Sequence, residues 1–452
     1  MTDIVLFRAR THLKDGDEDA AKQAYLDVLR IDPTHCAALT ELGALAHGTG
    51  HVSAAREAFG QALRYHPDSQ VARLGYAYLL SEAGEPAAAV DHYRAALAVD
   101  PDLYQAHQGL ARALTDLGGN ADEHWRKGFE GHAVVPRRYR GKGTGIPLIV
   151  LLSARGGNVP TRHWIDERVY VVTSIYTDYL DPEEMVPADA AAIVNAIGDA
   201  DLAHVALINA ERIVRGATVP VINAPALVRA TGREDNARRL ADIPNLIVPR
   251  MAPLSRAADF GYPLLLRSLG YHTGQHFVCV ESREALAAAA GSLPGGDPLA
   301  IEYLDARGPD GMARKYRTMF IGGRLYPLHL AISADWKVHY FTAAMEADPG
   351  FRAEESRFLD DMPGVIGARA MAAVARVQVV MGLDYGGIDF ALAPDGRVLL
   401  FEANATMAIV PPGPDPIWDY RRHAVADVLA AARDLLPGTP DSATVCGKSA
   451  TG

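Results

Sequence analysis

The first quarter of the chain repeats itself every 34 residues, and this periodicity constrains the fold more than any other feature. An alanine, an aromatic residue, a proline and a glycine all recur at that spacing. The four sets are Ala21, Ala55 and Ala89; Tyr25, Phe59 and Tyr93; Pro33, Pro67 and Pro101; and Gly50, Gly84 and Gly118. A period of this length is typical of folds in which each unit stacks on its neighbours, and about three units make a stable stack.

The pattern resembles the tetratricopeptide repeat, a helix-turn-helix unit. The resemblance implies that the alanine packs against a neighbouring aromatic side chain, the proline ends the second helix and the glycine occupies the turn within a unit. One position departs from the family pattern. The glycine that the family has in its first helix is present in one unit as Gly43, but the next two units have Ala77 and Ala111 there. We therefore expect an α-solenoid over residues 1–118, which either recruits a peptide or protein partner or mediates a homodimer.

Composition indicates a globular chain long enough for several domains. Its 452 residues are 49% hydrophobic, and the net charge of −11 argues against nucleic-acid binding, which needs an excess of Lys and Arg. Cys36, Cys279 and Cys446 are odd in number and far apart, so neither a disulfide framework nor a thiolate metal site is indicated. Because an apolar signal core and a long uninterrupted apolar run are both missing, we expect a cytoplasmic protein that makes no membrane contact.

After a polar stretch at 119–145, expected to be a linker, strands and helices alternate. The strand-like runs are PLIVLLS (147–153), VYVVTSIY (169–176), HVALINA (204–210) and VPVINA (219–224), and PADAAAIVNAIGD (187–199) is helix-like. This alternation predicts an α/β domain with a mostly parallel sheet over residues 146–250.

From Gly261 onward the pattern indicates an antiparallel sheet with helices on one side, in an α+β domain spanning 251–436. The strand-like runs are YPLLLRS, HFVCVES, LAIEYLD, KYRTMFIGG and LYPLHLAIS, and the helix-like segments include REALAAAAG and ARAMAAVARVQVVMG. Residues 437–452 lack apolar content, and we expect them to form a flexible tail.

The segment GGIDFALAPDGRVLLFEANAT (386–406) indicates a closing hairpin. Asp395-Gly396 lies between two apolar runs and favours a two-residue turn. The resulting register opposes Phe390 to Phe401, Leu392 to Leu399, Ile388 to Ala403 and Asp389 to Glu402. The last of these pairs places two carboxylates side by side on one face of the sheet.

Opposed carboxylates repel each other, and three arrangements relieve the repulsion: one acid is protonated, a basic side chain lies between them, or a divalent cation bridges them. The expected neighbours on that face are Ala391, Leu400 and Asn404, none of which is basic. Asn404 adds a neutral oxygen, and such a set of hard donors suits Mg²⁺ that also binds water and phosphate. We therefore predict a metal site at Asp389, Glu402 and Asn404.

An Asp, a Glu thirteen residues later and an Asn two residues beyond, on a closing hairpin, resemble the metal site of the ATP-grasp superfamily of carboxylate-amine ligases. The resemblance covers about residues 145–435. It implies a pre-ATP-grasp α/β domain at 146–250, an ATP-grasp fold at 251–436, and ATP and Mg²⁺ as cofactors.

The same resemblance implies phosphate-binding and catalytic residues. Arg267 stands where the family usually has a lysine, and Gly270 and Gly274 belong to the loop that would close over the phosphates. Lys315 and Arg317 are two residues apart, which puts them on one strand face. They are the predicted catalytic cations for the γ-phosphate and the acylphosphate.

The adenine side would be formed by AIEYLDARGPDG. Glu302 and Leu304 match the hinge positions whose main chain contacts adenine, with Tyr303 between them. Asp305 and Asp310 stay as alternatives for the ribose.

For other parts of the site the sequence does not decide between candidate residues. Arg233, Arg238 and Arg239 are equal candidates for a further phosphate contact. Residues 154–158 and the stretch holding Trp336, Lys337 and His339 are candidates for acceptor specificity, although a buried structural role is favoured for His339.

The leading hypothesis is an ADP-forming ligase that joins a carboxylate to an amine through an acylphosphate, with small-molecule or peptide substrates. One alternative is a non-catalytic nucleotide-binding scaffold with a degenerate ATP-grasp domain, which the Arg at 267 favours. Another is phosphoryl transfer without an amine acceptor, in which a phosphorylated product accumulates.

Overall fold

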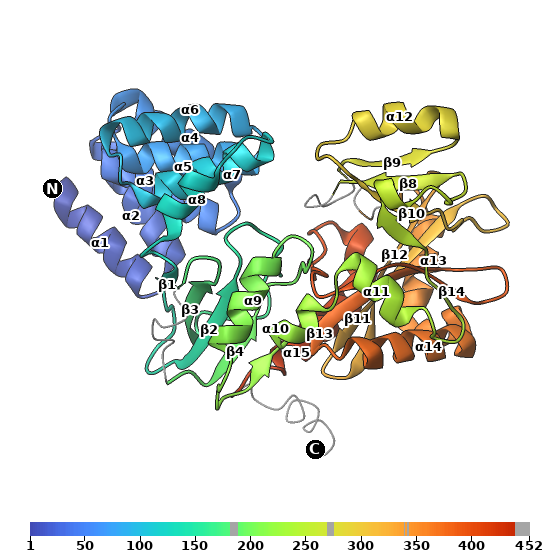
Figure 1. Ribbon diagram of the computed structural model, residues 1–452. Coiled ribbons are helices and arrows are strands. Elements are labelled where there is room, and N and C mark those ends of the chain that lie inside the picture. The colour runs from blue at the N-terminus through green and yellow to red at the C-terminus, as the bar shows by residue number, and fades with distance from the viewer. Residues whose placement is uncertain (181–188, 269–274, 339, 341–342, 439–452) are drawn as a thin grey trace, which may run out of the picture. The chain divides into compact units, whose positions relative to one another are not determined.

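The computed structural model describes residues 1–180, 189–268, 275–338, 340 and 343–438. The chain divides into two compact units (Figure 1). Unit 1 comprises Met1–Gly145 with the short segments Glu167–Val171 and Tyr179–Asp181, and unit 2 comprises the remainder. Gly270, Gly274 and His339, which the sequence analysis singled out, lie outside the described residues.

Unit 1 is built from helices that pack in consecutive antiparallel pairs. They are α1 (Thr2–Lys14), α2 (Glu18–Ile31), α3 (Cys36–Gly48), α4 (Val52–Tyr65), α5 (Gln70–Glu82), α6 (Pro86–Val99), α7 (Tyr104–Asp116) and α8 (Asp122–Phe129), followed by strand β1 (Val134–Pro136). The predicted N-terminal α-solenoid is confirmed. It extends beyond the predicted end at 118, because α8 packs on α7 through buried Trp125 and Phe129.

The repeated residues occupy the expected places. The alanines at 21, 55 and 89 are fully buried, and the aromatic residues four positions later are buried on the same helices. The prolines at 33, 67 and 101 follow the ends of α2, α4 and α6. The glycines at 50, 84 and 118 have positive φ in the turn within each pair, and Gly16 adds an earlier member with φ 79°.

A further pair of glycines in the solenoid, Gly75 and Gly109, also recurs at the 34-residue spacing. The ring of Phe59 lies against Gly75, where a Cβ atom would stand 2.5 Å from it, and the ring of Tyr93 lies against Gly109 in the same way. In the first unit the corresponding position is Glu41, which accepts a hydrogen bond of 3.0 Å from the Tyr25 hydroxyl. These glycines leave room for the aromatic ring of the preceding helix, and they were not among the repeated positions predicted from the sequence.

Unit 2 begins with a sheet whose order includes β3-β2-β4-β5. Its strands are β2 (Ile146–Leu152), β3 (Tyr170–Tyr176), β4 (Ala192–Asn195) and β5 (Val221–Ile222), accompanied by α9 (His204–Ile213), α10 (Pro225–Arg229) and α11 (Arg233–Leu240). Strands β2, β4 and β5 are parallel, as predicted.

Two assignments in this region were exchanged. The run 187–199, predicted as helix, contains strand β4, and the run 204–210, predicted as strand, lies in α9. Strand β4 is buried along its whole length, so it lacks the alternation that marks a half-exposed strand. In α9 the buried Ala206, Leu207 and Ala210 recur at helical spacing, while Val205 is exposed.

The later strands of unit 2 form two sheets rather than one. The first has the order β7-β10-β8-β9 and is antiparallel. It consists of β7 (Met251–Pro253), β8 (Leu264–Arg267), β9 (Phe277–Val280) and β10 (Leu299–Glu302), with the 3₁₀ turn η1 (Leu254–Arg256) and helix α12 (Arg283–Gly291). Helix α12 packs on β9 (Figure 1).

The last sheet has the order β12-β11-β13-β14-β6, in which only β6 pairs in parallel fashion among the described strands. Its elements are β6 (Leu246–Ile247), β11 (Ala313–Ile321), β12 (Arg324–Ser333), β13 (Tyr385–Leu392) and β14 (Val398–Asn404), with α13 (Pro349–Asp360), α14 (Met362–Met381), η3 (Pro416–Trp418) and α15 (Asp419–Arg433). The hairpin β13–β14 therefore lies near the centre of this sheet.

Helix α14 is the one described helix that is long and apolar enough, by length and composition, to cross a membrane. It carries Arg369 and Arg376, and its buried residues recur at helical spacing. It also packs on β13 and β14. This is the pattern of a helix that covers a sheet, and by itself it is weak evidence for a membrane span.

Candidate functional site

The candidate site is organised around one row of polar residues that crosses four adjacent strands. His329 on β12 pairs in register with Arg317 on β11, Arg317 with Asp389 on β13, and Asp389 with Glu402 on β14. Because opposed residues in an antiparallel sheet project to the same face, these four side chains share one surface. The predicted juxtaposition of Asp389 and Glu402 is confirmed.

The turn that produces this register differs from the predicted one. Ala393 and Arg397 are bonded across a three-residue loop in which Gly396 has φ 78°, so Phe390 opposes Leu400 and Leu392 opposes Val398. The predicted partners of Phe390 and Leu392 are therefore wrong. A β-bulge at Phe401 then shifts the register by one residue and brings Asp389 opposite Glu402.

A second bulge lies on the other side of the row. The register between β11 and β12 shifts between Arg317 and Thr318, which leaves Leu328 as the extra residue on β12. Bulges change the direction of neighbouring side chains and are common beside binding sites. Here they flank the polar row at both ends.

Asp389 is held by two cations. Its carboxylate accepts hydrogen bonds of 2.6 and 2.7 Å from Nε and Nη2 of Arg317, and Nζ of Lys315 lies 3.1 Å away. Burial raises the pKa of Asp389, but the charges of Arg317 and Lys315 outweigh burial and keep the pKa well below its usual range. The expectation that no basic residue lies near the acidic pair is therefore wrong, because it considered the hairpin alone and not β11 beside it.

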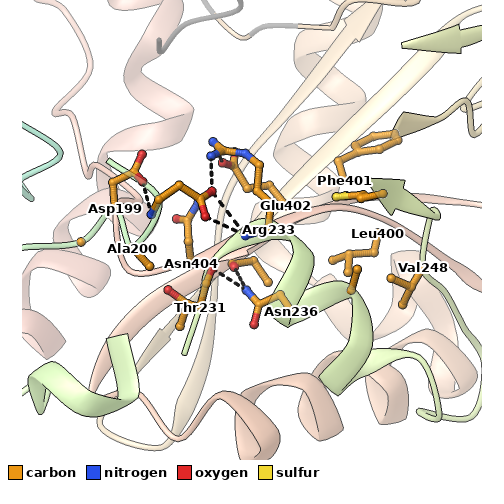
Figure 2. Close-up of a pocket in the computed structure, with 15 residues that line it drawn as sticks. Asp199, Ala200, Thr231, Arg233, Asn236, Val248, Leu400, Phe401, Glu402 and Asn404 are labelled. Carbon is orange, nitrogen blue, oxygen red and sulfur yellow. Dashed lines mark hydrogen bonds and ion pairs between the residues drawn. The ribbon is translucent and has the colours of Figure 1, made fainter. Parts of the chain in front are cut away.

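Glu402 has a different cationic partner. Its Oε1 lies 3.1 Å from Nη2 of Arg233, the first residue of α11, and Nη1 of Arg233 lies 2.7 Å from Asp201 (Figure 2). Burial lowers the pKa of Arg233, but Glu402 and Asp201 outweigh burial and raise it. The arginine thus links the acidic pair to the preceding α/β region.

The structure distinguishes the three arginines that were equal candidates for a phosphate contact in the sequence. Arg233 points into the site. Arg238 is exposed and pairs with Asp235, and Arg239 donates to the carbonyl oxygens of Ala230 and Val380. Arg233 is therefore the one of the three placed to contact a ligand there.

Asn404, the third predicted metal ligand, lines a small cavity together with Glu402, whereas Asp389 is not among the residues that line it. Oδ1 of Asn404 accepts hydrogen bonds of 3.0 and 2.9 Å from the backbone N–H and the hydroxyl of Thr406. The cavity has a volume of 30 Å³ and is also lined by Thr231 and Asn236 (Figure 2). Within the described residues, no group of three or more His, Cys, Asp or Glu side chains is arranged to hold a metal ion.

Arg317, Asp389 and Glu402 of the polar row line a cavity of 460 Å³. Eight of the predicted site residues line it: Arg267, Glu302, Tyr303, Leu304, Lys315, Arg317, Asp389 and Glu402. Arg233 and Lys337 line it as well, so five cations face the three carboxylates of Glu302, Asp389 and Glu402. Leu265, Ile301 and Met407 contribute apolar surface. Such a combination of charged groups and apolar surface suits a ligand with a polyanionic end and a flat apolar end.

Arg267 is the last residue of β8 and is largely buried. Its guanidinium lies 5.5 Å from the ring centroid of Phe277 on β9. Burial lowers its pKa, and the neighbouring charge of Arg233 lowers it further. A buried cation beside another cation favours an anionic ligand, because added negative charge relieves both effects.

The cavity is also lined by the end of β10 and by residues from a distant segment. Glu302 accepts a hydrogen bond of 3.1 Å from the backbone N–H of Arg250. Trp336 packs edge-on against Phe277, and Nζ of Lys337 donates a hydrogen bond of 3.4 Å to the Phe277 carbonyl. Both Trp336 and Lys337 line the cavity, as do Gly157 and Asn158 from the segment 154–158.

The two candidates for a ribose contact have other partners. Asp305 pairs with Arg307, and Asp310 pairs with Arg314. Neither acid lines the cavity.

Comparison with known proteins identifies the N-terminal part of the chain. A tetratricopeptide-repeat family model matches residues 3–35. Among solved structures, a tetratricopeptide repeat protein from Parabacteroides merdae ATCC 43184 is 21% identical with a TM-score of 0.26, and the match covers 28% of this chain and 51% of that one. A MamA protein is 25% identical with a TM-score of 0.27, with 28% and 70% covered. Thus the match spans about half of the first of these chains.

No curated protein matches the chain at a significant level. Residues from about 3 to 130 form a tetratricopeptide-repeat region, a class of fold that contacts other proteins. The mixed α/β part that follows contains the three sheets and the cationic cavity described above.

Proposed function

We propose that unit 2 is an ATP-dependent ligase of the ATP-grasp type that joins a carboxylate to an amine. The observation that carries the proposal is the 460 Å³ cavity, in which Arg233, Arg267, Lys315 and Arg317 converge beside Asp389 and Glu402. With Lys337 and Glu302 included, five cations and three acids line the cavity, and the surplus of positive charge favours a polyphosphate. The apolar surface near Tyr303 and Leu304 favours a nucleotide base.

The residues are compatible with the magnesium ion that accompanies ATP. Asp389 and Glu402 are hard oxygen donors on opposed strand positions, and the Glu402 side chain is 31% exposed. These two would hold the ion, with Asn404 as the third candidate ligand. Bound magnesium would neutralise phosphate charge as the phosphoryl group moves.

The chain's own cations would act on the transferred group. A carboxylate oxygen of the substrate attacks the γ-phosphorus, the bond to the bridging oxygen breaks, and ADP leaves with the electron pair. Arg317 and Lys315 are fixed against Asp389 and would stabilise the charge on the equatorial oxygens. The neutral amine then attacks the acyl carbon, phosphate leaves with its electron pair, and the amine proton passes to solvent.

A second candidate function is a nucleotide-binding scaffold without turnover. The ion pairs that neutralise Asp389 internally favour it, because a buried carboxylate held by two cations is stable without a metal ion. In both cases the repeat region would recruit a peptide or protein partner or mediate dimerisation. A cytoplasmic location remains part of the proposal.

One experiment separates these functions. The purified chain is incubated with ATP, Mg²⁺, hydroxylamine and a panel of carboxylic acids. Hydroxamate formation with stoichiometric ADP release is expected for a ligase. Nucleotide binding without either product would support the scaffold, and accumulation of a stable phosphorylated acid that resists hydroxylamine would indicate phosphoryl transfer alone.

A further inference from the structure

A second cavity of 250 Å³ lies next to the first and shares Lys315, Arg317 and Ala408 with it. The two catalytic cations of the proposed function therefore form a common wall. A group held in the second cavity against that wall would adjoin a nucleotide phosphate in the first. None of the described residues that line the second cavity is Asp or Glu.

Arg421 on α15 adds a third cation to this cavity and is 6% exposed. Its Nε lies 3.2 Å from Oε1 of Glu355, a fully buried residue, and its guanidinium lies 4.3 Å from the ring centroid of Tyr340. Glu355 also accepts hydrogen bonds from the Tyr420 hydroxyl and the backbone N–H of Leu330. The ion pair and the ring contact fix the guanidinium in one orientation, as a built binding site requires.

His329, the end of the polar row, also lines the second cavity and is 6% exposed. Its Nδ1 is buried and makes no hydrogen bond within the part of the chain that the structure describes. Burial lowers the pKa of His329 well below its usual value, and Arg317 lowers it further, so the ring is neutral. A buried polar nitrogen without a hydrogen-bond partner destabilises the fold, and a ligand that bonds to it removes this cost.

The rest of the cavity is apolar. Leu328, the extra residue of the β12 bulge, lines it together with Val410 and Trp418. Arg421 is paired with Glu355, and Lys315 and Arg317 are paired with Asp389, but neither acid lines this cavity. The cavity surface is therefore cationic, which favours an anion over an ammonium group. The apolar surface and the volume select a short hydrocarbon body behind that anion.

We propose that this second cavity binds the carboxylate substrate, and that this substrate is a compact monocarboxylic acid with an apolar or aromatic body. Arg421, Arg317 and Lys315 hold its carboxylate, and His329 adds a hydrogen bond. The assignment of this acid as the phosphoryl acceptor rests on the proposed function, whereas its binding at Arg421 does not.

Binding of simple acids tests the inference directly. Isovalerate and phenylacetate are titrated into the full chain by calorimetry and ligand-observed NMR, with isobutylamine and benzylamine as cationic counterparts. At least one acid is expected to bind and neither amine. Absence of acid binding, or equal binding of acids and amines, would overturn the proposal.

Substitutions locate the bound acid. Val410→Trp fills the second cavity from a partly exposed position, and acid affinity is expected to fall at least tenfold. Val379→Trp is the matched control, because Val379 is exposed on α14 and lines neither cavity. Unchanged acid affinity in Val410→Trp would place the acid elsewhere and refute the assignment.

A further variant removes the charge of Arg421 without leaving the buried carboxylate of Glu355 unpaired. The double substitution Arg421→Met with Glu355→Gln removes both members of the ion pair and keeps an acceptor for Tyr420. Acid binding is expected to be lost while the circular dichroism spectrum is retained, and retained binding in the folded double variant would contradict the role of Arg421.

Binding of a non-hydrolysable ATP analogue, measured on the same samples, is expected to be unchanged in Val410→Trp. Acid binding without nucleotide binding would refute the proposed ligase and leave the acid site standing.

Discussion

Arg317 and Asp389 lie directly opposite each other on strands β11 and β13, and two hydrogen bonds of 2.6 and 2.7 Å join the guanidinium to the carboxylate. The pair is flanked by His329 on one side and Glu402 on the other. It marks the boundary between the two cavities of unit 2, because Arg317 lines both.

The Asp389 ion pairs predict an acid-sensitive contribution to stability. The pKa of Asp389 is depressed in the folded state, so its stabilising effect is present above the ordinary Asp pKa of about 4 and is lost progressively as the pH falls below that value toward the depressed pKa. Asp389→Asn is expected to lower the free energy of unfolding by about 3 kcal/mol at pH 7, because it leaves two buried cations without a charged partner. The difference from wild type is expected to shrink as the pH approaches 3.

Urea unfolding followed by tryptophan fluorescence at a series of pH values measures this effect. Asp360→Asn, on an exposed position of α13, provides the matched control and is expected to follow the wild-type profile. A pH-independent difference for Asp389→Asn would show that the loss comes from packing rather than charge.

Arg267 is expected to contribute to nucleotide affinity through its charge. Arg267→Ala should weaken binding of a non-hydrolysable ATP analogue at least tenfold, while Arg267→Lys should stay within a few-fold of wild type because a cation is retained. Arg238→Ala is the control, since Arg238 is exposed, pairs with Asp235 and lies outside the cavity. Equal affinities for the Arg267→Ala and Arg238→Ala variants would remove Arg267 from the binding site.

Glu402→Gln tests the predicted metal ligand with little risk to the fold. The amide oxygen still accepts a hydrogen bond from Arg233, and the side chain is partly exposed. Hydroxamate formation is expected to fall at least a hundredfold, because a neutral amide binds Mg²⁺ much more weakly than a carboxylate does. Glu346→Gln, exposed and outside both cavities, should keep wild-type activity; wild-type activity in Glu402→Gln would exclude it as a ligand.

Glycine packing in the repeat region predicts a stability difference between two chemically identical substitutions. Gly75→Ala would place a Cβ 2.5 Å from the ring of Phe59, and we expect a loss of about 2 kcal/mol. Gly60→Ala meets only Tyr76 at 3.6 Å and should stabilise α4 by up to about 1 kcal/mol. Thermal unfolding monitored at 222 nm compares the two, and equal effects would contradict the close contact with Phe59.

Local patterns in the sequence were sufficient to predict those parts of the fold that depend on the spacing of residues along the chain. The 34-residue period identified the solenoid, and the alternation of strands and helices identified a partly parallel sheet followed by antiparallel strands. The pairing of Asp389 with Glu402 was predicted correctly although the turn was not, because the bulge at Phe401 compensates for the longer loop. Strand β4 and helix α9 were exchanged because a short buried run of Ala, Ile and Val fits either structure until its neighbours are known.

The cations of the site depended on contacts between distant segments. Lys315 and Arg317 were recognised as functional, but nothing in the sequence set β11 beside β13, so their pairing with Asp389 was missed. Arg233 could not be distinguished from Arg238 and Arg239 without the direction of α11. His329 and Arg421 were overlooked, although a lone histidine between two leucines in an apolar strand is a signal that could have identified the former.

Because of the bulge at Phe401, the length of the hairpin loop does not determine which residues lie opposite each other at the two acids, Asp389 and Glu402. A one-residue slip would normally turn every later side chain to the opposite face, yet here the additional loop residue is absorbed before the slip reaches Glu402. A one-residue insertion or deletion in this hairpin loop can therefore be compensated by the gain or loss of a bulge residue. The facing carboxylates then keep their positions although the loop beside them varies in length.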